Sequence, residues 1–114
     1  MAFSEIERAR ISKRLTEYCD ARIPVHVRNE LRLGFRIEGH NVLLFEERPA
    51  YRPPHDWREL PVAKFKYVRR RNVWHLFCQH RDLRWHAYEP MRTAGGLDRL
   101  LQEVDSDPTG IFFG

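Results

Sequence analysis

The sequence predicts an α+β fold, in which an N-terminal helix, about five mainly antiparallel strands (a hairpin plus a meander) and a C-terminal helix precede a short apolar tail. Three patterns support this prediction: a capped helical pattern at the start, alternating apolar and polar residues from Leu31, and a second helical pattern near the end. The length of 114 residues is usual for one domain, so we expect residues 1–114 to form a single domain.

Two helices bracket the predicted sheet. The first is expected over residues 4–21, because Ser4 and Glu7 have the spacing of a capping box and Pro24 stops the helix. Its apolar stripe consists of Ile6, Ile11, Leu15 and Tyr18. The second helix is predicted from a stripe that ends before Asp107-Pro108 and consists of Leu97, Leu100, Leu101 and Val104.

The strand pattern begins after Pro24. Residues 31–37 alternate between apolar and polar side chains, residues 38–41 supply turn chemistry with Gly39, and residues 42–48 return as the second strand of a hairpin. Three further apolar runs, VAKFKYV, VWHLFCQ and LRWHAY, are separated by turns short enough to form an antiparallel meander.

Residues 48–61 interrupt the strand pattern. They contain four of the seven prolines, which lack the amide donor of a sheet ladder, so we expect a long loop that Trp57 holds onto the core. At the other end of the chain, Ile111, Phe112 and Phe113 are expected to dock against the domain.

Composition restricts the classes of protein considered. No apolar run reaches the roughly 20 residues that span a bilayer, and the charged start lacks a signal core, so we expect a cytoplasmic protein without membrane contact. Cys19 and Cys78 lie far apart, which argues against a disulfide framework or a zinc ribbon and favours two buried thiols. We expect no metal, no cofactor and no catalytic residue.

Positive charge is concentrated in residues 62–88, which contain seven Lys and Arg residues and one Asp. One phase of the predicted strands, extended by two arginines of the hairpin, forms a candidate surface for nucleic acid or an acidic partner, in which the aromatic residues can stack on bases. It consists of Arg32, Arg36, Lys64, Lys66, His75, Phe77, Arg84, His86 and Tyr88. The opposite phase, with Phe65, Trp74 and Trp85, is expected to face both helices.

The segments LRLGFRIEG, LFEERP, PVAKFKYV, DLRWHAYEP and VDSDPTGIFFG together resemble DUF3024, a bacterial family of domains of unknown function. The resemblance covers nearly the whole chain. It implies no activity, substrate or catalytic residue.

Three functions therefore stay open. The preferred one is a small non-enzymatic binding module that uses the basic, aromatic-bearing sheet face. The first alternative is a homodimeric interaction domain, in which the same face or an edge strand pairs with its symmetry mate. The second is a small hydrolase or nuclease, which the sequence supports less, because Glu46 and Glu47 are adjacent on a strand and so point to opposite faces.

Overall fold

The computed structural model describes residues 2–50 and 56–114. Helix α1 (Glu5–Arg22) is followed by a 3-10 turn (Val25–Val27) and the hairpin β1 (Arg32–Glu38) and β2 (Asn41–Pro49). Then come β3 (Trp57–Val68), β4 (Val73–Gln79), β5 (Trp85–Ala87), a 3-10 turn (Glu89–Met91), β6 (Thr93–Ala94) and α2 (Leu97–Ser106). The strands form one antiparallel sheet in the order β1-β2-β3-β4-β5, with β6 also paired to β4, so the predicted α+β fold is confirmed.

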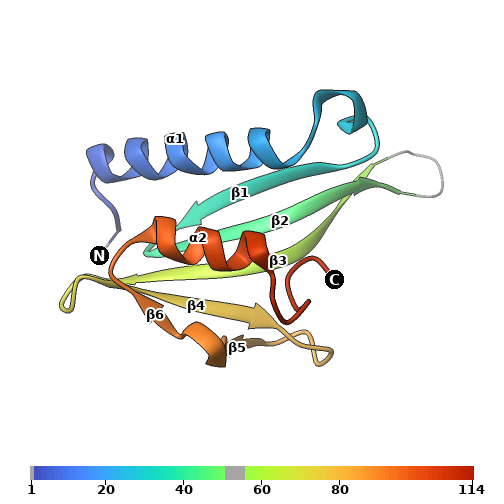
Figure 1. Ribbon diagram of the computed structural model, residues 1–114. Coiled ribbons are helices and arrows are strands. Elements are labelled where there is room, and N and C mark those ends of the chain that lie inside the picture. The colour runs from blue at the N-terminus through green and yellow to red at the C-terminus, as the bar shows by residue number, and fades with distance from the viewer. Residues whose placement is uncertain (1, 51–55) are drawn as a thin grey trace.

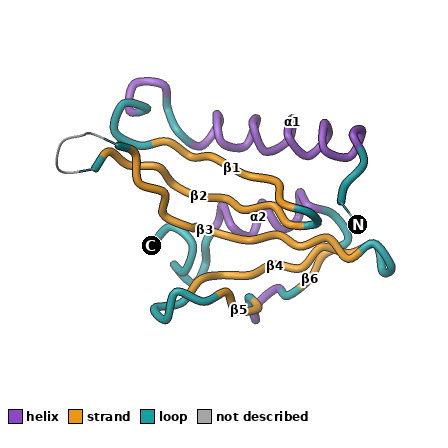
Figure 2. Tube along the Cα trace, turned by 180° about the vertical axis from the view of Figure 1, so that it is seen from behind, coloured by secondary structure: helices purple, strands orange, loops and turns teal. Residues whose placement is uncertain are grey.

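Both helices lie on the same side of the sheet, and the view from behind shows strands in front of them (Figures 1 and 2). Side chains link the two helices directly: Arg14 pairs with Asp98, and the Tyr18 hydroxyl donates to Asp105 at 3.2 Å. The core lies between the helices and the sheet. Its fully enclosed members include Leu15, Leu44, Phe65, Leu76 and Leu100.

Helix α1 begins as predicted. The Ser4 hydroxyl accepts from the Glu7 amide, and the Glu7 carboxylate accepts from the Ser4 amide, which completes the capping box. The apolar stripe differs at its start, because Ile6 is 67% exposed. Phe3 takes the core position instead and stacks on Trp74 with ring centroids 5.7 Å apart.

The Glu7 capping carboxylate also pairs with Arg69 at 2.8 Å, and these hydrogen bonds lower its pKa from 4.5 to about 2. A folded-state pKa below the unfolded value stabilises the protein above pH 4.5, and this contribution disappears as the pH falls toward about 2. We therefore expect Glu7→Gln to lower the melting temperature near neutral pH, with a difference from the unaltered protein that shrinks across this acid range.

Thermal melts of both proteins over that pH range check the expectation. Glu17→Gln is the matched control, because Glu17 is exposed on the same helix and forms no ion pair within the described residues. A Glu7→Gln difference that stays constant down to the lowest pH would contradict the assigned role of this carboxylate.

The proline-rich segment is more regular than predicted. Strand β2 extends to Pro49 and β3 begins at Trp57, so the described part of the expected loop reduces to Ala50 and Asp56, and residues 51–55 lie outside the described chain. Pro61 is tolerated because it adjoins a β-bulge, where the pairing of β2 with β3 shifts by one residue. Trp57 does not belong to the core cluster, contrary to the prediction.

The tail docks mainly through Phe112, which is 6% exposed and lies with its ring centroid 4.9 Å from that of Tyr88. The Asp107 carboxylate accepts from the amides of Phe112 and Phe113 at 3.0 and 2.8 Å and so fixes the course of the tail. Ile111 is 39% exposed, so the predicted docking is correct for the two phenylalanines and wrong for Ile111.

Candidate functional site

The sheet side that faces away from the helices carries a mixed aromatic and charged surface, which we call the open sheet face. Residues paired across antiparallel strands share a face, so the strand register defines its members. None of these residues is buried. Those that matter for binding are Arg32, Arg36, Leu43, Phe45, Trp57, Glu59, Pro61, Lys64, Lys66, His75, Phe77 and Trp85.

Cations lie over aromatic rings across this face. The Arg32 guanidinium is 3.7 Å from the Trp57 ring centroid, and the Lys64 ammonium is 5.4 Å from that of Phe77. Such contacts hold a ring and a charge next to each other on the same surface. A ligand that offers both a π face and an anion would find both partners there.

Phe45 can lie across β1 because its cross-strand partner is glycine. A Cβ atom at Gly34 would come within 2.8 Å of the Phe45 ring, which is closer than a side chain tolerates. Arg36 lies above the same ring at 5.1 Å. Gly34 therefore allows the aromatic surface to reach the edge strand of the sheet.

The positive charges of this face differ in how far they are neutralised. Arg36 donates to both carboxylate oxygens of Glu59 and also pairs with Glu38 at 3.0 Å, and these contacts raise the pKa of Arg36. Lys64 and Lys66 form no ion pair with the described residues, and the same holds for Arg70 and Arg71 in the turn after β3. The charge available to an anion is thus concentrated toward the β3–β4 turn.

A hollow of about 240 Å³ lies in the open sheet face. Phe45 and Pro61 line it from the central strands, while Trp85 closes it from β5. The Arg36–Glu59 pair lies at the same hollow and adds donors and acceptors to an otherwise apolar surface.

Six of the predicted surface residues lie together on this face: Arg32, Arg36, Lys64, Lys66, His75 and Phe77. The other three do not. His86 pairs with Cys78 and faces the helix side, Arg84 belongs to the turn before β5, and Tyr88 is 2% exposed and donates to Glu103 at 2.7 Å. Burial and this hydrogen bond raise the pKa of Tyr88 to about 12, and its buried ring has no face free for stacking.

Trp85 lies on the open sheet face, where side-chain alternation predicted Arg84, His86 and Tyr88. Five residues separate Gln79 from Trp85, so odd-numbered residues of β4 pair with odd-numbered residues of β5, and Trp85 lies on the side of Phe77. The backbone at Leu83 contributes to this turn with φ +62°. The prediction that Trp85 packs under the helices was wrong. The length of the turn determines which residues of β5 face the helices, and side-chain alternation alone does not.

The β4–β5 turn gathers a second group of titratable side chains. The rings of His80 and His86 stack with centroids 4.0 Å apart, and His86 lies 2.9 Å from the Asp82 carboxylate. Cys78 lies 3.5 Å from His80, but burial raises the pKa of its thiol, which disfavours a reactive thiolate. No three His, Cys, Asp or Glu side chains in the described ranges are placed to bind one metal ion.

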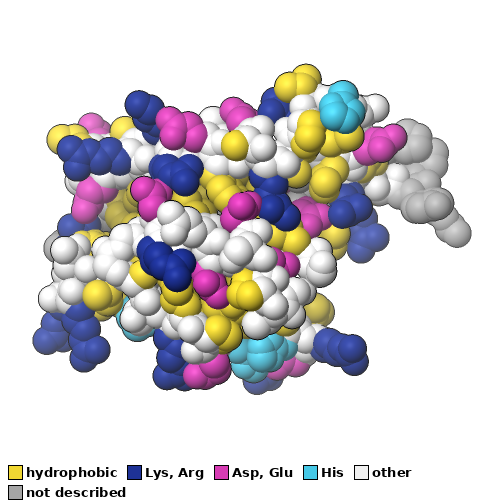
Figure 3. Space-filling model, viewed as in Figure 1, with side chains coloured by type: hydrophobic (Ala, Val, Ile, Leu, Met, Phe, Trp, Pro, Cys, Tyr) yellow, Lys and Arg dark blue, Asp and Glu magenta, His cyan; other side chains and the backbone are white. Residues whose placement is uncertain are grey.

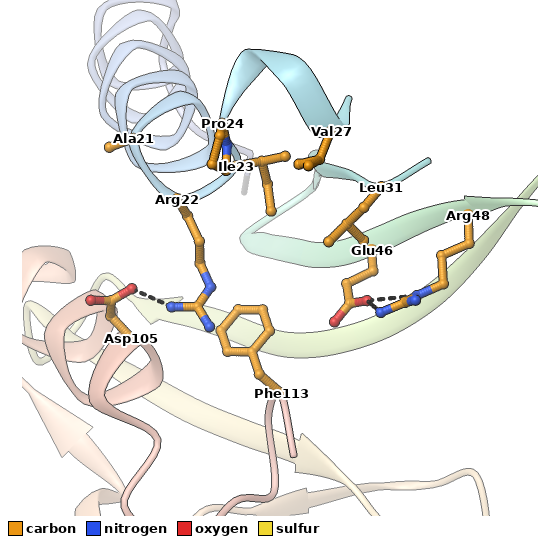
Figure 4. Close-up of a pocket in the computed structure, with 10 residues that line it drawn as sticks. All are labelled: Ala21, Arg22, Ile23, Pro24, Val27, Leu31, Glu46, Arg48, Asp105 and Phe113. Atoms are coloured by element: carbon orange, nitrogen blue, oxygen red, sulfur yellow. Dashed lines mark hydrogen bonds and ion pairs between the residues drawn. The ribbon is translucent and has the colours of Figure 1, made fainter. Parts of the chain in front are cut away.

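The helix side has a different character. Acidic and basic side chains are interspersed over the two helices (Figure 3). Within the described residues, no helix has the length and hydrophobicity to cross a membrane. This side also contains a pocket of about 620 Å³, where the end of α1, the end of β2, the end of α2 and the tail meet (Figure 4).

The family comparison agrees with the resemblance of the sequence segments. The family described as Domain of unknown function (DUF3024) matches residues 3–114, and the chain belongs to this family. Neither a curated protein nor a solved structure matches the chain.

Proposed function

We propose that this DUF3024 domain is a binding module that holds single-stranded nucleic acid on its open sheet face. Bases stack on Phe77, Trp85 and Phe45, and phosphates contact Lys64 and Lys66. The observation that carries the proposal is the combination, on one sheet surface, of partly exposed aromatic rings and two lysines that form no ion pair with the described residues.

The chemistry of the surface supports single strands over a duplex. Stacking needs an accessible base face, which a duplex keeps inside its own stack, and it tolerates every base because each has a π face. Lysine releases condensed counterions when it replaces them at a phosphate. We therefore expect weak binding with little sequence preference and a marked dependence on salt.

Fluorescence anisotropy with a labelled mixed-sequence oligonucleotide tests the proposal. Replacing both Lys64 and Lys66 by Ala is expected to weaken binding equally for all sequences. It should also reduce the steepness of the slope of log K against log salt by about 1.4, since each lost phosphate contact on a single strand removes about 0.7 from that slope.

The matched control is the double change Lys13→Ala and Arg8→Ala. Both residues are exposed, form no ion pair within the described residues and lie on α1, across the sheet from the proposed surface. If no oligonucleotide binds at low salt, or if the two double variants behave alike, the proposal fails. Concentration-dependent dimerisation through the open sheet face in that case would assign this surface to self-association.

A further inference from the structure

We propose that the pocket on the helix side binds a small zwitterion, a molecule that carries a carboxylate and an ammonium group on an apolar body. Free amino acids with apolar side chains have this chemistry. The pocket is independent of the open sheet face, and its volume of about 620 Å³ falls in the range of small-molecule sites.

Glu46 supplies the negative charge. It lies on the helix side of β2, and its side chain is only 14% exposed. Arg48 donates to one carboxylate oxygen, Oε2, through two nitrogens at 3.1 and 2.9 Å. The other oxygen, Oε1, has no hydrogen-bond partner among the described residues, so it can accept from a ligand ammonium.

Arg22 supplies the positive charge from another element. Its Nη1 donates to Asp105 at 2.8 Å, and its guanidinium lies 3.7 Å above the Phe113 ring centroid (Figure 4). These two contacts fix the plane of the group. They leave further N–H donors of the guanidinium without a partner in the described chain, and such donors can bind a carboxylate.

Apolar side chains supply most of the remaining lining of the pocket. Ile23, Val27 and Leu31 line the pocket from the end of α1 and the segment after it, and Phe113 lines it from the tail. The Asp107 carboxylate holds the Phe113 amide, so the tail is positioned before any ligand arrives. A preorganised wall reduces the ordering cost of binding.

The balance of charge selects the ligand class. Each ligand-facing charge already has one protein partner of opposite sign, so the pocket as a whole is neutral. A ligand with one charge pairs only with Arg22 or only with Glu46. It removes water from the other side chain and offers that side chain no hydrogen-bond partner in return. A zwitterion satisfies both, and discrimination of this kind depends on polar groups that the wrong ligand leaves unpaired.

Two-dimensional amide NMR titrations of the whole chain test this with three matched probes. L-phenylalanine carries both charges, 3-phenylpropanoate lacks the ammonium group, and 2-phenylethylamine lacks the carboxylate. We expect L-phenylalanine to bind with a Kd of about 1 mM or tighter, and each single-charge probe to bind at least about tenfold more weakly. The shifted amides should be those at the end of α1, the end of β2 and the tail.

Glu46→Gln should abolish the preference for L-phenylalanine over 3-phenylpropanoate. Glu47→Gln should leave it intact, because Glu47 is the next residue on β2 but faces the other side of the sheet. Arg22→Gln should abolish the preference over 2-phenylethylamine, with Arg92→Gln, an exposed arginine paired with Glu89, as its control.

Even if Arg22→Gln fails to fold, the three probes on the unaltered protein test whether the pocket prefers a zwitterion. Three probes that bind equally, or L-phenylalanine that produces no saturable shifts up to about 10 mM, would overturn the proposal. Loss of the preference in Glu47→Gln would overturn it as well.

Discussion

Replacing Phe112 by Ala is expected to lower the free energy of unfolding by about 3 to 5 kcal/mol, the usual cost of truncating a buried phenylalanine. Phe112 is 6% exposed and packs on Tyr88, which is itself 2% exposed, so the cavity would open inside the core and not at its edge. Since a domain of this kind is stabilised by roughly 5 to 15 kcal/mol, the loss is a large part of the total. Thermal unfolding should show a melting temperature lower by roughly 10 to 20 °C.

Ile111→Ala is the control for this prediction. Ile111 is the next residue along the tail but is 39% exposed, so its truncation is expected to change stability by less than about 0.5 kcal/mol. Deletion of residues 111–114 should match or exceed the effect of Phe112→Ala. A melting temperature that hardly moves in Phe112→Ala would mean that the tail does not complete the core.

The architecture follows from local signals in the sequence. The Ser4–Glu7 capping box, the Gly39 turn and the short turns of the meander each determine a nearby element without long-range information. The helices then have one apolar surface available, because Leu33, Phe35, Val42 and Phe65 all point to the same side of the sheet. Consistency between local and global preferences made this part predictable.

Pairing between distant residues was less predictable. The prolines of residues 48–61 indicated a loop, yet Pro61 fits a strand because a bulge beside it removes the need for its missing amide. Likewise, Ile6 has the helical spacing of a core residue but is exposed, because Phe3 folds back onto Trp74. In both cases a tertiary contact decided the outcome.

The residues of the candidate surfaces were likewise predictable only in part. Alternation placed Lys64, Lys66, His75 and Phe77 correctly on one face, because they belong to long strands with a defined register. The short strand β5 depends on the length of its turn, so Trp85 and Tyr88 exchanged their expected sides. The pocket at Arg22 and Glu46 had no sequence signal, since three stretches far apart in the chain build it.

Because Trp85 lies on the open sheet face and Tyr88 does not, substitutions at these two residues test the observed surface against the one that alternation predicted. Trp85→Ala is expected to weaken oligonucleotide binding by about 1 to 3 kcal/mol, the contribution of one base stacked on an aromatic side chain. The salt slope should stay unchanged, because stacking releases no counterion. Anisotropy titrations at several salt concentrations measure both quantities.

Tyr88→Phe is the comparison variant, because it keeps the ring and removes only the hydroxyl that donates to Glu103. A buried ring cannot stack on a base, so this change should leave nucleic-acid affinity as it was, although loss of the buried hydrogen bond is expected to lower stability by about 1 kcal/mol. The melting temperature and the affinity should therefore respond separately. If Tyr88→Phe weakened binding while Trp85→Ala did not, the ligand would contact the helix side of β5. The open sheet face would then lose its assigned role, because Trp85 is the aromatic residue that closes its hollow.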